Sequence, residues 1–180
     1  LLVWHPPYKI MKKESALAYV GHGSNKNRKK NDFYPSPKNS MEELLKKITL
    51  EGEIWECACG DGVLSKVMES KNYKVYSSDL IDRGYGEVGI DFLKSDKKAD
   101  TIITNPPFNL STEFTLKAFE LSRRYIIFLN KLSFLEGIKR KNSIFEKRYL
   151  KKIYVFSKRL QFGGSGLMAF AWFIFDKNYN

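Results

Sequence analysis

The 180-residue sequence is poor in cysteine and histidine, and it lacks any long uninterrupted apolar run. Cys57 and Cys59 are the only cysteines, and the histidines His5 and His22 lie far from them in sequence. A Cys-x-Cys pair offers too few ligands for a closed zinc site, and a disulfide across one intervening residue would be strained. We therefore expect two small buried thiols, no bound metal and a reducing, cytoplasmic location. The absence of a membrane-length apolar stretch and of a secretory signal argues against a membrane or exported protein.

Acidic residues are scarce in two segments of the chain, although its middle is mildly acidic. The formal net charge is +11. Residues 1–30 hold seven Lys/Arg against one acid and residues 138–160 hold nine against one, whereas residues 31–137 hold 14 basic and 17 acidic residues. An acidic body with two basic flanks suits a protein that binds a polyanion beside a pocket for a small cationic or zwitterionic cofactor. The alternative is that the basic residues only keep the protein in solution.

The length allows one domain with a full hydrophobic core. Residues 1–31 show weak hydrophobic periodicity and end in a basic run rich in glycine and asparagine. We therefore expect a flexible basic N-terminal arm there and a single domain over residues 32–180. The arm could lie along phosphates or form a disordered leader.

Strand and helix patterns alternate over most of the expected domain. Strands are predicted where β-branched and aromatic residues cluster, near residues 53–57, 74–79, 100–104, 124–129, 153–156 and 168–175. Helices are predicted near residues 40–50, 63–68, 111–121 and 144–150, the first of them opened by a capping box at Ser40. This alternation, with short connections, predicts an α/β, Rossmann-like fold with a doubly wound, mostly parallel sheet.

A glycine turn joins the first predicted strand to a helix. Residues 56–62 read Glu-Cys-Ala-Cys-Gly-Asp-Gly, which places an acid four residues before the first glycine. Glycine is needed where the backbone turns tightly and a ligand approaches it closely. The third glycine of the dinucleotide fingerprint is missing, which argues against a nicotinamide cofactor. The next strand ends at Asp79, where a carboxylate could accept both hydroxyls of a ribose, with Asp82 as the alternative.

Two prolines end the strand predicted at residues 100–104. Residues 105–108 read Asn-Pro-Pro-Phe, so the chain turns just past the carboxyl end of the strand, where open α/β sheets bind ligands. Proline keeps its carbonyl, so the turn presents acceptors, to which Asn105 adds an amide oxygen and Phe108 a flat apolar face. Acceptors beside an aromatic ring suit a planar ligand with an exocyclic amino group. The alternative is a proline-terminated strand with a core phenylalanine.

The tetrapeptide resembles the [Asn/Asp]-Pro-Pro-aromatic signature of S-adenosylmethionine (SAM)-dependent methyltransferases that act on amino groups, most familiar in the adenine-N6 DNA enzymes. Residues 32–37 resemble the Asp-x-Tyr-x-Thr-Pro element of that family, with Ser36 in place of threonine, and residues 56–62 resemble its [Asp/Glu]-x-x-x-Gly-x-Gly motif. The resemblance covers residues 32–175. In the order of its motifs the chain is similar to the adenine-N6 DNA methyltransferases whose SAM motifs precede the catalytic motif, and small phage- or mobile-element-type enzymes match it best. It implies a class I SAM-dependent methyltransferase fold with an antiparallel terminal strand. The separate target-recognition region that is usual in the family has no counterpart here.

The resemblance also implies a role for individual residues in binding SAM. The proline segment would contact the methionine end, through Tyr34, Ser36 and Pro37, and Glu56 would face the amino group. The rest of the cofactor site would consist of Cys57, Ala58, Gly60, Gly62, Asp79, Leu80, Asp91, Phe92 and Asn105. Asp91 would accept from the adenine amino group, although a plain turn acid fits this residue nearly as well.

Catalysis is assigned by the same resemblance to the tetrapeptide, Asn105, Pro106, Pro107 and Phe108. The Asn105 side chain and the Pro106 carbonyl would hold the two N–H bonds of the target amine, and Phe108 would stack on the flipped-out base. Phe162 is a candidate for the opposite face of the base or, alternatively, a lid or core residue. The phosphates of double-stranded DNA would be bound by a basic run that includes Lys139, Arg140, Lys141, Arg148 and Lys151.

Other functions fit the same residues. A methyltransferase for structured RNA or for a protein glutamine amide would use the same tetrapeptide, since each target is a planar nitrogen, but the two basic flanks favour nucleic acid. A catalytically silent SAM-fold module that binds nucleic acid is a further alternative, against which the intact Asn105, Gly60 and Gly62 argue. A protein partner or a second copy of the chain could supply target specificity.

Overall fold

A computed structural model of the protein describes residues 35–162 and 168–179. The predicted basic arm at residues 1–31, Tyr34 of the proline segment and residues 163–167 lie outside the described residues. Among the residues that are described, no helix combines the length and the apolar composition needed to cross a membrane.

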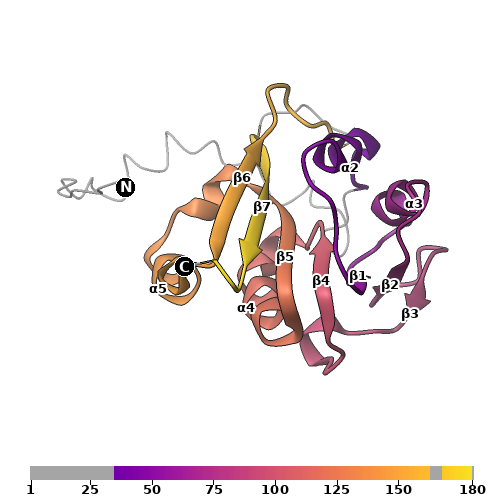
Figure 1. The fold of residues 1–180 in the computed structure, drawn as a ribbon, viewed down its shortest axis with the longest axis horizontal. Helices are drawn as coiled ribbons and strands as arrows, with labels where there is room; N and C mark the ends of the chain where they lie inside the picture. The colour runs from indigo at the N-terminus through magenta and orange to yellow at the C-terminus, as the bar shows by residue number, and fades with distance from the viewer. Residues whose placement is uncertain (1–34, 163–167, 180) are drawn as a thin grey trace, which may run out of the picture. The chain divides into compact units, whose positions relative to one another are not determined.

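Seven strands form one sheet in the order β3-β2-β1-β4-β5-β7-β6 (Figure 1). The pairs of β1 with β2 and β4, of β2 with β3 and of β4 with β5 are parallel, whereas β7 runs antiparallel to both β5 and β6. The predicted mostly parallel α/β sheet with an antiparallel terminal strand is thus confirmed. The strands are β1 (Ile54–Glu56), β2 (Val75–Asp79), β3 (Glu87–Val88), β4 (Ala99–Thr104), β5 (Ser122–Lys131), β6 (Leu150–Val155) and β7 (Phe170–Asp176).

Helices and short 3-10 turns connect the strands. The α-helices of the described chain are α2 (Lys38–Leu45), α3 (Val63–Glu69), α4 (Ser111–Leu121) and α5 (Ile138–Ser143). The 3-10 helices are η3 (Phe92–Lys94), η4 (Phe108–Leu110), η5 (Leu132–Leu135) and η6 (Phe145–Lys147). The helix predicted at residues 111–121 coincides with α4, and α3 follows the glycine turn as predicted.

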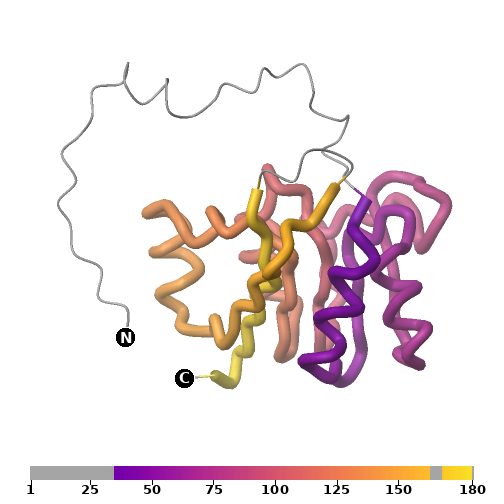
Figure 2. The backbone as a smooth tube through the Cα atoms, turned by 90° about the horizontal axis from the view of Figure 1, so that it is seen from above, coloured from indigo at the N-terminus to yellow at the C-terminus, as the bar shows by residue number. Residues whose placement is uncertain are grey.

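The sheet separates two apolar clusters, one on each face. Helices α2 and α3 pack on one face, where Met41 shares a cluster with Ile103. Helix α4 packs on the other, where Phe114 shares a cluster with Ile102 (Figures 1 and 2). Successive side chains of a strand point to opposite faces, so Ile102 and Ile103 of β4 divide between the two clusters. Burial on both faces fixes the central strands, and with them the loops at their ends.

The first helix differs from its prediction at both ends. It begins at Lys38, directly after Pro37, rather than at the expected cap Ser40, and it ends at Leu45 rather than near residue 50. The Pro37 carbonyl accepts the N–H of Ser40 at 2.9 Å, so Ser40 already lies inside the first turn. Its hydroxyl is buried and has no hydrogen-bond partner within the described part of the chain. The predicted capping box is therefore wrong.

The helix predicted at residues 144–150 is also wrong. The structure has α5 before this segment, the 3-10 turn η6 within it, and the start of β6 at its end. Arg148 adopts a left-handed backbone conformation with φ of 59°, which ends η6 and turns the chain into β6. The glycine-rich segment of residues 84–89, where no strand is predicted, contains the two-residue strand β3.

Strands β1 and β4 lie next to each other, but the chain leaves β1 towards β2 and leaves β4 towards β5. Such a switch point leaves a crevice at the carboxyl ends of the two strands, where open α/β sheets bind ligands. The glycine turn follows β1 and Asn105 follows β4, so the two predicted motifs meet at this point.

Candidate functional site

Asn105 stands directly after β4, and its carboxamide is held from one side only. Its Nδ2 donates to the Ser36 Oγ at 3.0 Å. Its Oδ1 is buried and has no hydrogen-bond partner among the described residues. Buried polar atoms are nearly always paired, and leaving one unpaired costs about 1–3 kcal/mol. The site therefore presents an oriented acceptor that lacks a donor.

The tetrapeptide lies against the glycine turn. The Thr104 hydroxyl donates to the Ala58 carbonyl at 3.3 Å, which ties the end of β4 to the turn after β1. The Gly60 N–H donates to Asp79 Oδ2 at 2.8 Å, which ties the same turn to the end of β2. The structure thus brings Ala58, Gly60, Asp79 and Asn105 together at the carboxyl ends of three neighbouring parallel strands.

Phe108 lies in an aromatic cluster beside this edge. Its ring centroid is 5.9 Å from that of Phe162 and 5.3 Å from that of Phe170. The Lys131 Nζ lies 4.8 Å from the Phe108 centroid. The backbone after Pro107 turns at once into η4, because the Pro107 carbonyl accepts the Leu110 N–H at 2.9 Å. Phe162 therefore packs against Phe108 itself. This arrangement corresponds to the alternative in which Phe162 is a lid or core residue.

Glu56 is almost completely buried, at 1% exposed. The Ser65 hydroxyl of α3 donates to its carboxyl group and also lies 2.7 Å from the Ser77 hydroxyl. Burial raises the pKa of Glu56 to about 8, and the bond from Ser65 opposes this rise. Glu56 thus joins β1 to α3, and its predicted contact with a cofactor amino group stays a prediction.

Gly62 begins α3 in a left-handed conformation with φ of 79°. A Cβ added there would lie 2.3 Å from the Tyr85 ring. The Tyr85 hydroxyl donates to Glu69 Oε1 at 2.7 Å, and burial together with this bond raises the Tyr85 pKa to about 12. Close packing against Tyr85 is thus one physical reason for a glycine at this position. No local pattern predicts this contact, since Tyr85 lies in a polar, glycine-rich segment.

The end of β2 has the features of a site for a sugar and a ring. Asp79 Oδ1 accepts the Ile81 N–H at 2.9 Å, in addition to the bond from the glycine turn. A carboxylate offers about four lone-pair positions, so two remain for a ligand. Leu80, directly beside it, is 55% exposed. The Asp79 carbonyl accepts the Ile90 N–H at 3.1 Å, which brings Asp91 to the same edge.

Asp91 and Phe92 have local structural roles. Asp91 Oδ1 accepts the Leu93 N–H at 3.1 Å and so caps η3. Phe92 is 2% exposed and packs against Trp55 and Phe114, with centroids 5.2 and 4.9 Å apart. The Phe92 ring belongs to the core, and its place in the cofactor site stays a prediction. The side chains of both cysteines are likewise buried, as free thiols.

No family model and no curated protein sequence matches the chain. Solved structures do match it. A candidate RNA methyltransferase from Pyrococcus horikoshii superposes with a TM-score of 0.61 at 20% identity, over 92% of this chain and 97% of that one. The magnesium protoporphyrin IX methyltransferase of Synechocystis, crystallised with SAM, gives 0.58 at 11% identity, over 96% and 100%. A modification subunit of a candidate type I restriction enzyme from Vibrio vulnificus gives 0.60 at 14% identity, over 92% of this chain and 48% of the subunit.

The chain has the class I methyltransferase fold. Identities of 20% or less make this a likeness of fold. The Asn105 oxygen, which has no partner among the residues described, stands at the carboxyl edge of the sheet, beside the glycine turn.

The predicted basic run is divided between two ends of this methyltransferase fold. Lys139, Arg140 and Lys141 belong to α5, and Arg148 follows η6. Lys151 of β6 pairs with the buried Asp176 at 2.9 Å, and this bond raises the pKa of Lys151. The strand registers place that pair at the end of the sheet where β5 begins, remote from the carboxyl edge. Lys151 is therefore held in an ion pair away from the carboxyl edge, and its contact with phosphates stays a prediction.

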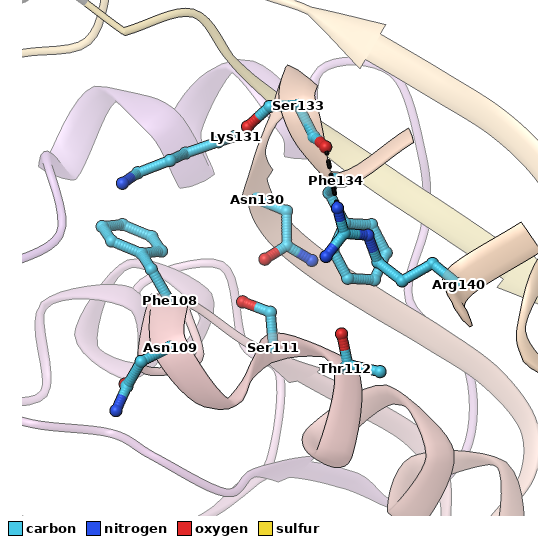
Figure 3. Close-up of a pocket in the computed structure, with 9 residues that line it drawn as sticks. All are labelled: Phe108, Asn109, Ser111, Thr112, Asn130, Lys131, Ser133, Phe134 and Arg140. Carbon is cyan, nitrogen blue, oxygen red and sulfur yellow. Dashed lines mark hydrogen bonds between the residues drawn. The ribbon is translucent and has the colours of Figure 1, made fainter. Parts of the chain in front are cut away.

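A cavity of about 120 Å³ opens beside Phe108, between η4 and α4 on one side and the end of β5 on the other (Figure 3). We call it the α4–β5 cavity. Its polar lining includes Ser111 and Thr112 of α4, Asn130 and Lys131 of β5, and Arg140 of α5. Of these five residues, Arg140 alone belongs to the basic run predicted to bind phosphates. Asn130 continues an apolar run that predicts a buried strand, so no local pattern marks it.

Proposed function

We propose that the protein is a SAM-dependent methyltransferase that methylates the exocyclic N6 amino nitrogen of adenine in DNA. The observation that supports this most is the Asn105 carboxamide. Its Nδ2 is held by Ser36, and its buried Oδ1 has no donor within the described chain. An amino group of a planar base is a donor of the kind that this acceptor lacks.

The residues present at the sheet edge fit SAM. Asp79 retains lone pairs for the ribose hydroxyls, and the exposed Leu80 beside it offers an apolar surface to the adenine of the cofactor. The Gly60 backbone lies between Asp79 and Asn105, where a chain of methionine length would run along the turn. When bound, SAM supplies a methyl group on a positively charged sulfur.

The protein's contribution is to hold the target amine in position. The adenine amino nitrogen is a weak nucleophile, because its lone pair is delocalised into the ring. Asn105 Oδ1 and the Pro106 carbonyl would each accept one N–H of this amine and draw the nitrogen towards tetrahedral geometry, which frees the lone pair. The bond from Asn105 to Ser36 keeps the oxygen oriented before the base arrives, so its placement costs little during the reaction. Phe108 would stack on the base, once Lys131 has moved off its ring.

RNA is the second candidate substrate. One of the solved structures with the same fold is a candidate RNA methyltransferase. Both nucleic acids carry the phosphates that a net charge of +11 would attract. Adenine presents the same amino group in both, so the described site serves either one.

Replacing Asn105 tests the proposal at its centre. We expect Asn105→Ala to lower kcat for adenine methylation by about 100-fold to 1000-fold, the usual effect of removing one positioned polar group at a reacting centre. SAM affinity, measured by calorimetry, should stay close to that of the wild type. Asn105→Asp, which keeps an oxygen acceptor, should retain measurable transfer. Methylation by Asn105→Ala at the wild-type rate would refute the assignment.

A further inference from the structure

The α4–β5 cavity contains a buried donor that lacks an acceptor. Asn130 is 1% exposed, and its Nδ2 has no hydrogen-bond partner in the described part of the chain. Figure 3 shows its carboxamide pointing into the cavity, between Ser111 and the Arg140 guanidinium. A buried N–H without a partner is costly, so the Asn130 amide, which follows the apolar residues 126–129 of β5, points to a ligand atom that accepts.

Arg140 presents a second unused donor to the same cavity. Its Nη2 donates to the Ser133 carbonyl at 3.2 Å, and the guanidinium lies over the Phe134 ring at 5.4 Å from the centroid. Its Nε is buried and without a partner among the residues that the structure describes. The planar group is therefore held in place on two sides, and its buried Nε–H lacks an acceptor among the described residues.

The first turn of α4 closes the other side of the cavity. This helix has 11 residues, and no described side chain caps its N-terminus, where the helix dipole favours negative charge. The hydroxyl groups of Ser111 and Thr112 line the cavity (Figure 3). Glu113, the acid of this turn, pairs with Lys139 at 3.6 Å, which offsets its charge.

We propose that the α4–β5 cavity binds a phosphate group of the nucleic-acid strand, next to the target adenine. The proposal rests on the proposed function, because Phe108 lines the cavity and is also the residue that would stack on the base. The oxygens of a phosphate accept hydrogen bonds and carry negative charge. The cavity offers them amide, guanidinium and hydroxyl donors and a helix N-terminus. Lys131 Nζ, which covers the Phe108 ring here, reaches the same cavity and adds positive charge.

Two substitutions test this site from different elements. Asn130→Asp puts a carboxylate of the same size where the phosphate would lie, and Arg140→Gln removes the guanidinium. We expect each to weaken binding of an adenine-containing DNA or RNA duplex by about tenfold at low salt. The slope of log K against log salt should fall by about one for Arg140→Gln. Fluorescence anisotropy of a labelled oligonucleotide at several salt concentrations measures both quantities.

The matched control is Arg123→Gln, which removes the same charge at the opposite end of β5. Arg123 pairs there with Glu53 and Asp100, at 2.8 and 3.2 Å. This variant should bind the duplex as the wild type does. SAM affinity by calorimetry and the melting temperature should be unchanged in Asn130→Asp, since its carboxylate lies near Arg140 and Lys131. A purely structural role of Asn130 would instead lower the melting temperature.

A chemical probe locates the phosphate. An oligonucleotide whose phosphates are replaced one at a time by neutral methylphosphonate should show one position, beside the methylated adenine, that weakens wild-type binding. The same replacement should cause no further loss of binding in Arg140→Gln.

Two results would show that the cavity proposal is wrong while the proposed function stands. In one, no phosphate position behaves in this way. In the other, both cavity variants bind with wild-type affinity and salt slope while the wild type still methylates. Inorganic phosphate that binds the wild type, without any loss of duplex binding in the variants, would assign the cavity to a free anion and overturn the proposal. A wild type that neither binds nor methylates nucleic acid refutes the proposed function as well.

Discussion

Ser36 and Asn105 form the contact at the site on which the proposed chemistry depends most. The serine hydroxyl occupies the position where the resembling family has threonine, and it accepts from Asn105 Nδ2 at 3.0 Å. Its function in this account is to orient the carboxamide so that Oδ1 faces the target amine.

The first prediction concerns this orienting role. We expect Ser36→Ala to lower kcat about tenfold, because the loss of one hydrogen bond frees the carboxamide to rotate. Ser36→Thr, which keeps the hydroxyl, should restore most of the rate. Steady-state kinetics with kcat and the KM for SAM measured separately provide the check. An unchanged kcat with a raised KM for SAM would show that the hydroxyl serves the cofactor rather than Asn105.

Glu56 makes the stability of the protein depend on pH. Its pKa is raised by burial from an ordinary 4.5 to about 8. A carboxyl group whose pKa is higher in the folded state binds its proton more tightly there. Its stabilising contribution is therefore complete below about pH 4.5, and it is lost as the pH rises through about 8.

From this group we expect the free energy of unfolding to fall by about 3 kcal/mol between pH 4.5 and 7, at about 1.4 kcal/mol per pH unit. Glu56→Gln, which can still accept from Ser65, should lack this decrease. Urea unfolding curves of both proteins over the pH range give the comparison. Parallel pH dependence in the two proteins would contradict the buried, neutral state of Glu56.

At the scale of elements, the glycine turn shows how packing and function use the same residues. Gly62 and Gly84 have the same left-handed φ of 79°, but only at Gly62 would a Cβ collide with another group, the Tyr85 ring. Gly84 has nothing within 4 Å of the added atom. Alanine substitutions at these two glycines therefore distinguish the cost of backbone strain, present at both, from the cost of steric overlap, present at Gly62 alone of the two.

We expect Gly84→Ala to cost about 1–2 kcal/mol of unfolding free energy, from the left-handed conformation alone. Gly62→Ala should cost a further 1–3 kcal/mol or so, because an extra methyl group must be fitted against Tyr85. Denaturant unfolding of both variants measures the difference. Equal losses in the two would mean that Tyr85 moves aside freely and that its packing does not explain Gly62.

Sequence patterns predicted the elements well where packing agrees with local preference. The central strand β4 is buried along nearly its whole length, as its apolar run predicts, and α4 buries six of its 11 residues. Prediction failed between residues 138 and 150, where α5 is polar nearly all round and Ile138 is 78% exposed. There the left-handed Arg148 and the pairing of Leu150 with Phe175 decide the structure. Neither a single backbone angle nor a pairing with a distant strand is visible in local sequence.

At the scale of the whole molecule, part of the site could be predicted because its residues follow strand ends. Parallel strands place their carboxyl ends at one edge, so Gly60, Asp79 and Asn105 come together whatever lies between them. The α4–β5 cavity could not be predicted in this way. Asn130 follows the buried apolar residues 126–129 near the end of β5, and only the packing of α4 and α5 around it makes it one wall of a cavity.

The nature of the methylated atom tests the central claim most directly. The protein would be incubated with SAM carrying an isotopically labelled methyl group and with DNA or RNA, and the nucleic acid digested to nucleosides for mass spectrometry. We predict labelled N6-methyladenine in the DNA, formed about 100-fold or more slowly when Asn105→Ala replaces the wild type. Label on another base, label only in protein, or an unlabelled nucleic acid in the presence of bound SAM would contradict the claim that Asn105 holds an adenine amino group for methyl transfer.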